Sequence, residues 1–229
     1  MPDHRLAGMA TDSSLIHDLP AITVRRISVS AMSNNVYLLT AKKSGVQALI
    51  DAADDAAAIR SMIGEAGADT PCAPGLRAVL TTHQHWDHIR ALPELASAGV
   101  ELAAGAEDAG AIEQEKEVSI GRRLHHGDVV QYDGISLDVI HLRGHTPGSV
   151  AFVCPVEDGP THLFTGDSLF PGGVGKTWSD EDFRQLIDDV EERIFSVYED
   201  DTIVHPGHGD PTTLGAERPK LAEWRERGW

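Results

Sequence analysis

Cysteine, long apolar runs and targeting signals are all scarce in this sequence. Its only cysteines, Cys72 and Cys154, are far apart and form no CxxC motif, which is typical of free thiols in a reducing compartment. The chain has no run of about 18 apolar residues that could cross a membrane. The N-terminus also lacks the basic and then apolar pattern of a signal peptide. We therefore expect a soluble, cytoplasmic protein.

Positive charge is scarce as well. The chain has 19 lysines and arginines against 36 aspartates and glutamates, which gives a formal net charge of −17. Such a surface keeps a protein soluble and repels the phosphates of nucleic acids and anionic membranes. We therefore expect a small-molecule partner, with no nucleic acid and no membrane bound. No feature of the sequence predicts an oligomeric state.

Histidine, in contrast, is concentrated in one place. The stretch 81–88 reads TTHQHWDH, so three imidazoles and a carboxylate lie within six residues. Imidazole nitrogens and carboxylate oxygens are the usual ligands of zinc and its first-row neighbours. The stretch 76–82 is an apolar run suited to a buried strand, and a helical pattern begins at Ile89. We therefore predict a metal site on a loop at the carboxyl end of a strand, where α/β sheets tend to place their sites.

The spacing within this stretch favours two adjacent metal ions over one. In an extended segment, His83 and His85 point in the same direction. Asp87 and His88 can aim at a second point nearby as the chain turns into the helix.

Strands and helices are predicted on both sides of the metal loop. Two runs of strands, each with helices beside it, indicate two sheets packed face to face with helices outside. Residues 1–20 are expected to form a flexible tail. Residues 21–229 are expected to form a single domain, because no linker rich in Pro, Gly or Ser divides them. Representative expected elements are strands at 22–30, 35–40, 46–50, 129–132 and 135–142, and helices at 54–66, 180–196 and 214–227.

Three later turns also carry a histidine or an aspartate beside glycine. They lie at 143–148, 164–168 and 205–210, and each follows a predicted strand. Glycine lets the backbone turn sharply and approach an ion closely. These turns are therefore candidates to complete the metal site.

The four motifs together resemble those of the metallo-β-lactamase superfamily. Within it, the chain is most similar to the glyoxalase II-like (hydroxyacylglutathione hydrolase-like) hydrolases, including the short bacterial ones. In chain order, the motifs are His83-x-His85-x-Asp87-His88, Gly144-His145-Thr146-Pro147-Gly148, Thr165-Gly166-Asp167 and Pro206-Gly207-His208-Gly209.

The resemblance implies an α+β fold of the αββα type, with two mixed sheets flanked by helices and a dinuclear site between the halves. It implies zinc as the preferred metal, with iron and manganese as alternatives. It also implies seven metal ligands: His83, His85 and His145 on one ion, Asp87, His88 and His208 on the other, and Asp167 bridging both.

The activity implied by the resemblance is metal-dependent hydrolysis, with catalytic roles for Asp87, His88 and Asp167. The leading hypothesis is cleavage of a thioester, such as a 2-hydroxyacyl thiol conjugate, by a hydroxide that bridges the two ions. A lactone or another ester is an alternative for the same site. An alternative of another class is a persulfide dioxygenase that uses a single iron.

Two residues after Asp167 are candidates for substrate binding. The sequence Gly175-Lys176-Thr177 suggests a phosphate-binding loop, but Phe170 occupies the position where that motif needs a glycine. In glyoxalase II-like proteins, a basic residue in this place lies near the substrate, which makes Lys176, and with it Trp178, a candidate. Only 21 residues follow His208. The helical domain that binds glutathione in long glyoxalase II proteins is therefore not expected.

The remaining histidines are expected to lie outside the metal site. We expect His141 to support the site without binding metal. Asp51, at the end of its strand, either bonds a ligand imidazole or simply shapes the turn. Solvated positions are expected for His4, His17, His125 and His126, and ordinary hydrogen bonds for His162 and His205.

Overall fold

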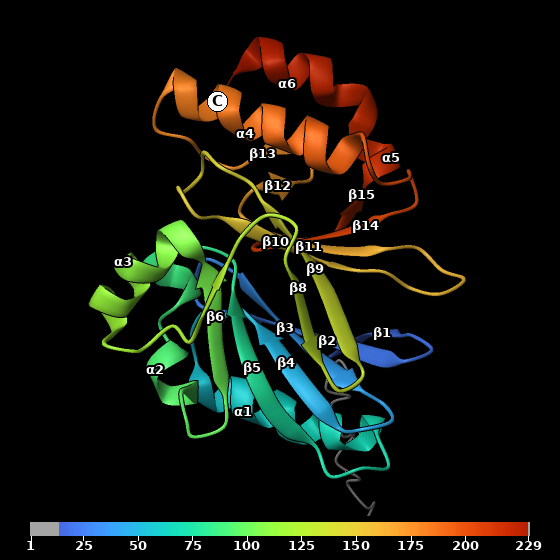
Figure 1. Ribbon diagram of the computed structural model, residues 1–229. Helices are drawn as coiled ribbons and strands as arrows, with labels where there is room; N and C mark the ends of the chain where they lie inside the picture. Colours follow the sequence, from blue (N-terminus) through green and yellow to red (C-terminus); the bar gives the residue numbers. More distant parts are fainter. Residues whose placement is uncertain (1–13, 229) are drawn as a thin grey trace, which may run out of the picture.

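The structure, a computed structural model, describes residues 14–228 and has four layers in the order helix, sheet, sheet, helix (Figure 1). This arrangement confirms the predicted αββα sandwich with two mixed sheets. The first sheet has seven strands and the second has six, and a small two-stranded ribbon lies beside the second. No helix among residues 14–228 is long and apolar enough to span a membrane.

The first sheet is formed by the N-terminal half of the chain. Its strands follow one another in sequence order, with antiparallel pairs from β1 to β4 and parallel pairs from β4 to β7. The parallel connections are made by helices on its outer face (Figure 1). The strands are β1 (Leu15–Asp18), β2 (Ile22–Val29), β3 (Asn34–Ala41), β4 (Val46–Ile50), β5 (Gly75–Thr81), β6 (Glu101–Gly105) and β7 (Arg122–Leu124), and the helices are α1 (Ala56–Glu65), α2 (Leu92–Leu95) and α3 (Ala106–Lys116).

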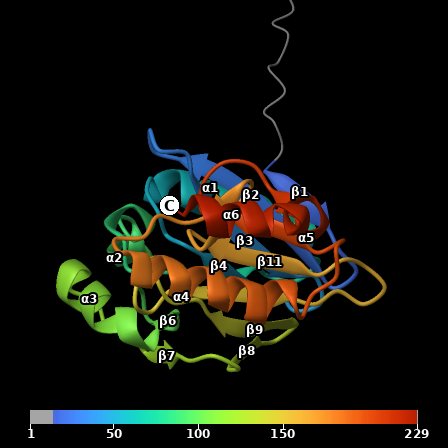
Figure 2. The same cartoon turned by 90° about the horizontal axis from the view of Figure 1, so that it is seen from above.

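The second sheet is formed by the C-terminal half, in the order β15-β14-β11-β10-β9-β8. Within this sheet, as far as the structure describes the chain, only β11 and β14 pair in parallel. Figure 2 shows α4 and α6 lying across the outer face of this sheet. The elements are β8 (Val129–Tyr132), β9 (Ile135–His141), β10 (Val150–Cys154), β11 (His162–Gly166), β12 (Leu169–Phe170), β13 (Gly173–Val174), α4 (Asp180–Val190), β14 (Ile203–Pro206), β15 (Thr212–Thr213), α5 (Leu214–Glu217) and α6 (Leu221–Arg227).

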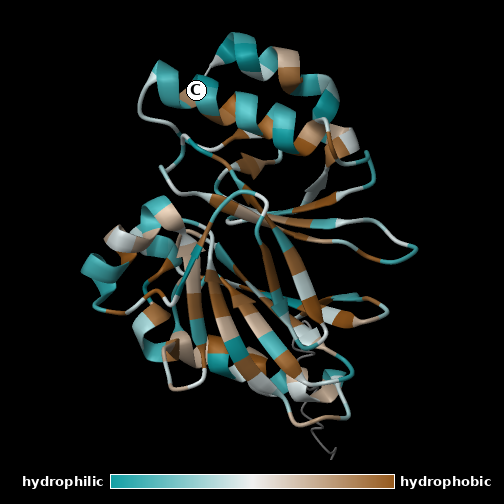
Figure 3. Ribbon diagram, viewed as in Figure 1, coloured by the Kyte–Doolittle hydropathy of each residue, from teal (hydrophilic) through white to brown (hydrophobic). Residues whose placement is uncertain are grey.

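Three apolar layers hold the sandwich together. One lies between the first sheet and its helices, one between the two sheets, and one between the second sheet and α4 and α6. In Figure 3 the strands are mainly brown, whereas the outer faces of the helices are teal. Burial of this apolar surface is the main favourable contribution to folding. It also fixes the strand ends whose loops carry the predicted ligands.

The helix and strand predictions are correct in part. The side chain of Ser179 accepts a hydrogen bond from Asp182 N and so caps α4, which begins at Asp180 as the predicted helix 180–196 does. The predicted helix 214–227 is interrupted by a tight turn at Arg218–Lys220 that contains Pro219, because proline cannot continue a hydrogen-bonded helix interior. The elements at 22–30, 35–40 and 46–50 are confirmed as β2, β3 and β4.

The predicted N-terminal tail is partly wrong. Residues 15–18 form strand β1, which pairs with β2 through Leu15–Arg25 and Asp18–Thr23. Ile16 packs against the apolar layer between the sheets. The four-residue strand was missed because its sequence is too short for an alternating pattern, so its place depends on pairing. Residues 1–13, including His4, lie outside the described residues.

Candidate metal centre

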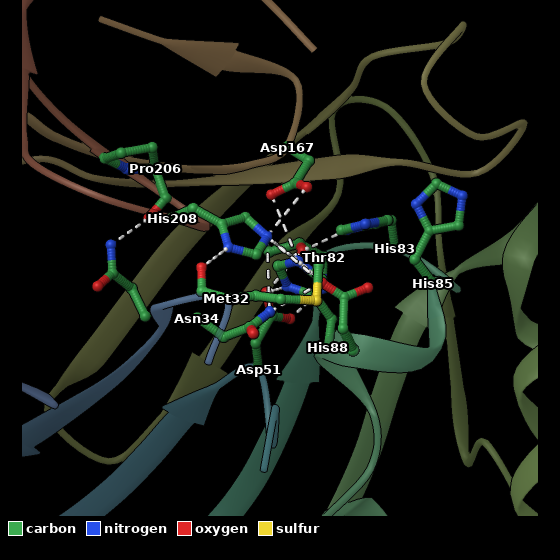
Figure 4. Close-up of polar contacts among 12 residues, drawn as sticks. Met32, Asn34, Asp51, Thr82, His83, His85, His88, Asp167, Pro206 and His208 are labelled. Carbon is green, nitrogen blue, oxygen red and sulfur yellow. Dashed lines mark hydrogen bonds and ion pairs between the residues drawn. The ribbon is translucent and has the colours of Figure 1, made fainter. Parts of the chain in front are cut away.

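The seven predicted ligands lie together at one edge of the two sheets, on loops that follow β5, β9, β11 and β14. Figure 4 labels five of them, His83, His85, His88, Asp167 and His208. Each loop leaves its strand at the carboxyl end, so the four loops converge although they are far apart in sequence. Their possible ligand atoms lie within 4.8 Å of one another in three groups. The groups are His83, His85 and His145; Asp87, His88 and His208; and His83, His88 and Asp167.

Asp167 lies between the first two groups. Its Oδ1 is 3.4 Å from His88 Nε2. Its Oδ2 is 3.4 Å from His208 Nε2 and 3.7 Å from His145 Nε2. A single carboxylate therefore faces both groups, which is the position that a bridging ligand would take.

The imidazole rings are oriented to share a third partner. His85 Nδ1 and His145 Nε2 are 3.0 Å apart, but the ring planes are perpendicular (90°) and the ring centroids are only 4.6 Å apart. The two nitrogens therefore lie off the line between the ring centres, so their lone pairs can converge on one point. His88 and His208 have a similar geometry, with 3.2 Å between nitrogens and planes 81° apart.

Two buried atoms of the cluster support a cation as that third partner. His83 Nε2 and Asp167 Oδ1 are buried and have no hydrogen-bond partner among the described residues. Buried polar atoms in native proteins almost always have a partner. Three imidazoles and a shared carboxylate match the ligands that zinc and its neighbours prefer. The residues therefore fit a divalent metal ion.

Two imidazoles of the cluster are neutral, whereas the carboxylates stabilise positive charge at His88. Burial lowers the pKa values of His83 and His145, so both rings are neutral and keep a lone pair for a metal. Burial also acts to lower the pKa of His88, but Asp167 and Asp51 outweigh it and raise that pKa to about 10. The carboxylate pKa of Asp167 is held well below its usual range, against the effect of burial, chiefly by His88.

Asp51 supports the cluster through hydrogen bonds to Thr82 and His88. Its carboxylate accepts hydrogen bonds from Thr82 N (2.7 Å) and Thr82 Oγ1 (2.8 Å). Its Oδ2 is 2.9 Å from His88 Nδ1. Of the two expectations for Asp51, the bond to the imidazole of a predicted ligand, His88, is thus confirmed. This bond fixes the ring so that Nε2 faces the cluster.

Other predicted ligands are held by groups that could not be recognised in the sequence. Asn34 lies between the predicted strands at 22–30 and 35–40, and its Nδ2 donates to Asp87 Oδ2 at 2.9 Å. The main-chain oxygen of Met32 is 2.9 Å from His208 Nδ1, and that of Lys176 is 2.7 Å from His145 Nδ1. Main-chain acceptors leave no mark in a sequence, so neither could be predicted.

The comparison with known sequences identifies the family. The metallo-β-lactamase superfamily matches residues 29–208 of the chain, a range that contains all seven predicted ligands. The chain belongs to this superfamily. With the His and Asp clusters described above, membership makes the protein a metallohydrolase of that superfamily.

Similar proteins cover most of the chain. Hydroxyacylglutathione hydrolase GloC of Haemophilus influenzae is 29% identical over 213 residues, which span 86% of this chain and 95% of that protein. The structure of ETHE1 from Myxococcus xanthus has a TM-score of 0.72 and 25% identity, covering 87% of this chain and 84% of that one. The structure of TTHA1623 in a di-iron-bound form has a TM-score of 0.63 and 29% identity, and the match covers 84% of this chain and 96% of that one.

The two candidate substrate-binding residues, Lys176 and Trp178, lie beside the cluster of predicted ligands. Trp178 is 66% exposed, although its ring centroid is only 6.5 Å from that of His85. The ammonium group of Lys176 is 4.7 Å from the Trp178 ring centroid. The bond between the main chain of Lys176 and His145 fastens this segment to the rim of the site.

The other histidines follow the predictions in part. His125 and His126 are exposed, as expected. His141 Nε2 is 2.7 Å from Pro147 O, so this ring holds the turn that follows His145 and does not join the ligand groups. His17 contradicts the expectation of a solvated position. Its ring meets those of His162 and His205 edge-on, at 4.5 and 5.2 Å between centroids.

His17, His162 and His205 are close enough to suggest a further metal site, but their geometry does not fit one. His162 Nδ1 and His205 Nε2 are 2.9 Å apart, with ring planes 6° apart and centroids separated by 5.2 Å. When the two nitrogens are only 2.9 Å apart, the ring centroids can be 5.2 Å apart only if both nitrogens lie on the line that joins the centroids. The two nitrogens therefore face each other across a hydrogen bond, as expected from the sequence, and leave no point for a shared ion.

This buried pair makes stability depend on pH. Burial lowers the pKa of His162 from 6.5 to about 4, and burial together with His162, His17 and Arg26 lowers the pKa of His205 to about 2. As the pH falls, His162 and His205 are protonated in the unfolded chain before they are protonated in the folded one. The contribution of this pair to the free energy of unfolding is therefore fully present above pH 6.5 and is lost as the pH decreases toward 4. For His162 alone, the loss is on the order of 3 kcal/mol.

The test is urea unfolding of the wild type and the double variant H162F/H205F at several pH values. The variant replaces both partners by apolar rings, so its free energy of unfolding should vary less between pH 6.5 and 4. H125A, which changes an exposed histidine, should keep the wild-type slope. Equal slopes for the wild type and the double variant would contradict the burial of two neutral imidazoles.

Proposed function

We propose that the protein is a dinuclear, zinc-dependent hydrolase that cleaves a thioester of the glyoxalase II type, such as a 2-hydroxyacyl thiol conjugate. The observation that carries the proposal is the place of Asp167, whose two oxygens face both ligand groups at 3.4–3.7 Å. The similarity to a hydroxyacylglutathione hydrolase and to a protein with a di-iron-bound form supports it.

Two divalent ions bound here would supply positive charge for a developing oxyanion and a water acidified to a pKa near 7. The residues of the chain hold and balance that charge. Five imidazoles and two carboxylates make up the ligand set, so two ions bring four positive charges against two negative ones. The remaining positive charge suits a substrate whose reaction places a negative charge on a carbonyl oxygen.

The segment after Asp167 is suited to orient such a substrate. Lys176 offers an ammonium group to an anionic end of the thiol carrier, and the exposed face of Trp178 offers an apolar surface. Met32, which is 47% exposed, lies beside His208 (Figure 4). A substrate with an apolar part and an anionic part, lying between these side chains, would place its carbonyl over the ligand groups.

The experiment that tests the function combines metal analysis with a substrate panel. We expect about two zinc ions per purified chain and turnover of 2-hydroxyacyl thioesters that exceeds turnover of matched lactones and oxygen esters. Preferred turnover of lactones would keep the site but change the substrate class. About one iron per chain, with oxygen uptake in the presence of a persulfide, would overturn the hydrolase proposal.

A further inference from the structure

A buried carboxylate outside the ligand set joins two of the ligand loops. Asp108 lies in the first turn of α3 and has no exposed surface. Its Oδ2 accepts hydrogen bonds from Gln84 N at 2.9 Å and from Thr146 Oγ1 at 2.6 Å. Its Oδ1 accepts from Gly148 N at 2.6 Å. All three donors belong to loops that carry predicted ligands.

The position of these donors defines what Asp108 can control. Gln84 stands between His83 and His85, and Thr146 follows His145 directly. One carboxylate therefore fixes the relative positions of two loops that carry the three imidazoles of one ligand group. Because Gln84 belongs to the N-terminal half and Thr146 to the C-terminal half, the same bonds also fasten the two halves of the sandwich.

The contact leaves little room for adjustment. A Cβ at Gly148 would overlap Asp108 N and would lie 2.8 Å from Asp108 Oδ1, so a side chain there would displace the carboxylate. The hydroxyl of Thr146 is also 2.6 Å from Ser149 Oγ, which fixes its direction. Burial of a carboxylate is unfavourable unless its oxygens are hydrogen-bonded, and here three donors satisfy them.

The other ligand group has separate supports. Asp87 is held by Asn34, His88 by Asp51, and His208 by the main chain of Met32. None of these groups shares a hydrogen bond with Asp108 among the described residues. A change at Asp108 should therefore act on one metal subsite and not on the other.

We propose that Asp108 is a positioning residue that holds His83, His85 and His145 in the geometry of one metal subsite, acting through Gln84 N, Thr146 and Gly148 N. The inference deepens the proposed dinuclear function and rests on it. Asp108 touches neither the metal nor the substrate. It sets the distance between the loops, so its loss weakens one of two ions selectively.

The first test measures both metal affinities of the Asp108→Asn variant by titration with a zinc-chelating dye. Asparagine keeps the size of the side chain but has an NH2 group in place of one acceptor oxygen. That group cannot accept the hydrogen bonds that the main-chain amides and the hydroxyl donate to Asp108. We expect one zinc affinity to fall about 10- to 100-fold, with the other unchanged. Equal loss of both affinities, or no loss of either, would overturn the proposal.

Two sets of variants separate positioning from general destabilisation. Asp69→Asn removes a carboxylate that is also held by side chains, those of Thr23 and Arg25 on β2, away from the ligand loops. This variant should keep both affinities. Thr146→Val should reproduce the selective loss of one zinc affinity. Thr146→Ser, which keeps the hydroxyl, should bind both ions as tightly as the wild type. The Thr146 pair also keeps the test valid if Asp108→Asn fails to fold.

A second readout does not depend on how many ions the wild type binds. In metal-free protein, Asp108→Asn should shift the imidazole NMR signals of His85 and His145 and leave those of His88 and His208 in place. A wild type that binds a single ion, together with this selective shift, would refute the dinuclear function but retain the role of Asp108. Unshifted His85 and His145 signals would refute the role itself.

Discussion

The Asp167→Asn variant is expected to lose at least one bound metal ion and at least about 10²-fold in hydrolytic rate. The asparagine side chain has the same shape but carries no negative charge and only one acceptor oxygen. It cannot face His88 on one side and His145 and His208 on the other as two ionised oxygens do. Metal content and steady-state rates of the purified variant give the measurement.

Asp138→Asn provides the matched control for this change. Asp138 is an exposed carboxylate on β9, so the substitution changes the net charge equally without touching the cluster. It should keep the wild-type metal content and rate. An Asp167→Asn enzyme with full metal content and full rate would show that Asp167 is no bridging ligand.

Gly207→Ala is expected to have an effect of similar size although it removes no functional group. A Cβ at this position would overlap Asp167 Oδ1 and would lie 2.7 Å from His88 Cε1. The backbone cannot retreat easily, because Gly207 N donates to Gly166 O and Gly207 O accepts from Asn35 N, both at 2.8 Å. We expect the carboxylate to be displaced, with metal affinity reduced at least about 10-fold.

Gly110→Ala serves as the control for this second variant. Gly110 lies inside α3, and a Cβ there would meet nothing within 4 Å. That variant should keep its metal and gain up to about 1 kcal/mol of stability, because alanine favours the helix. If Gly207→Ala binds metal as tightly as the wild type, the close packing around Asp167 has no role in forming the site.

The ligand loops were predictable because their signals are local. His83, His85, Asp87 and His88 fall within six residues that follow a recognisable buried strand, so residue type and position could be read together. The later motifs place His145, Asp167 and His208 beside glycines after strands. Helix α4 was predictable for the same kind of reason, since its cap and its amphipathic pattern lie in one continuous segment.

The supporting residues were not predictable because their partners are distant in sequence. Asn34 reaches Asp87 across 53 residues, and Asp108 reaches Gly148 across 40. In the sequence, Asn34 has the features of a turn residue and Asp108 those of an acidic helix surface. His17 was similarly assigned to solvent, since only the pairing of β1 with β2 brings it to His162.

The sequence by itself determined the fold family, the predicted donor set and the strand ends that present it, because ligand chemistry and local chain direction are properties of short segments. Tertiary structure alone decided which rings converge and which merely face each other, as His85 and His145 differ from His162 and His205. It also decided that Asp167 faces two groups of predicted ligands and that Asp51 and Asp108 contact the loops that carry them. These roles depend on orientation and burial, which arise only when the two sheets pack and bring distant strand ends to one edge.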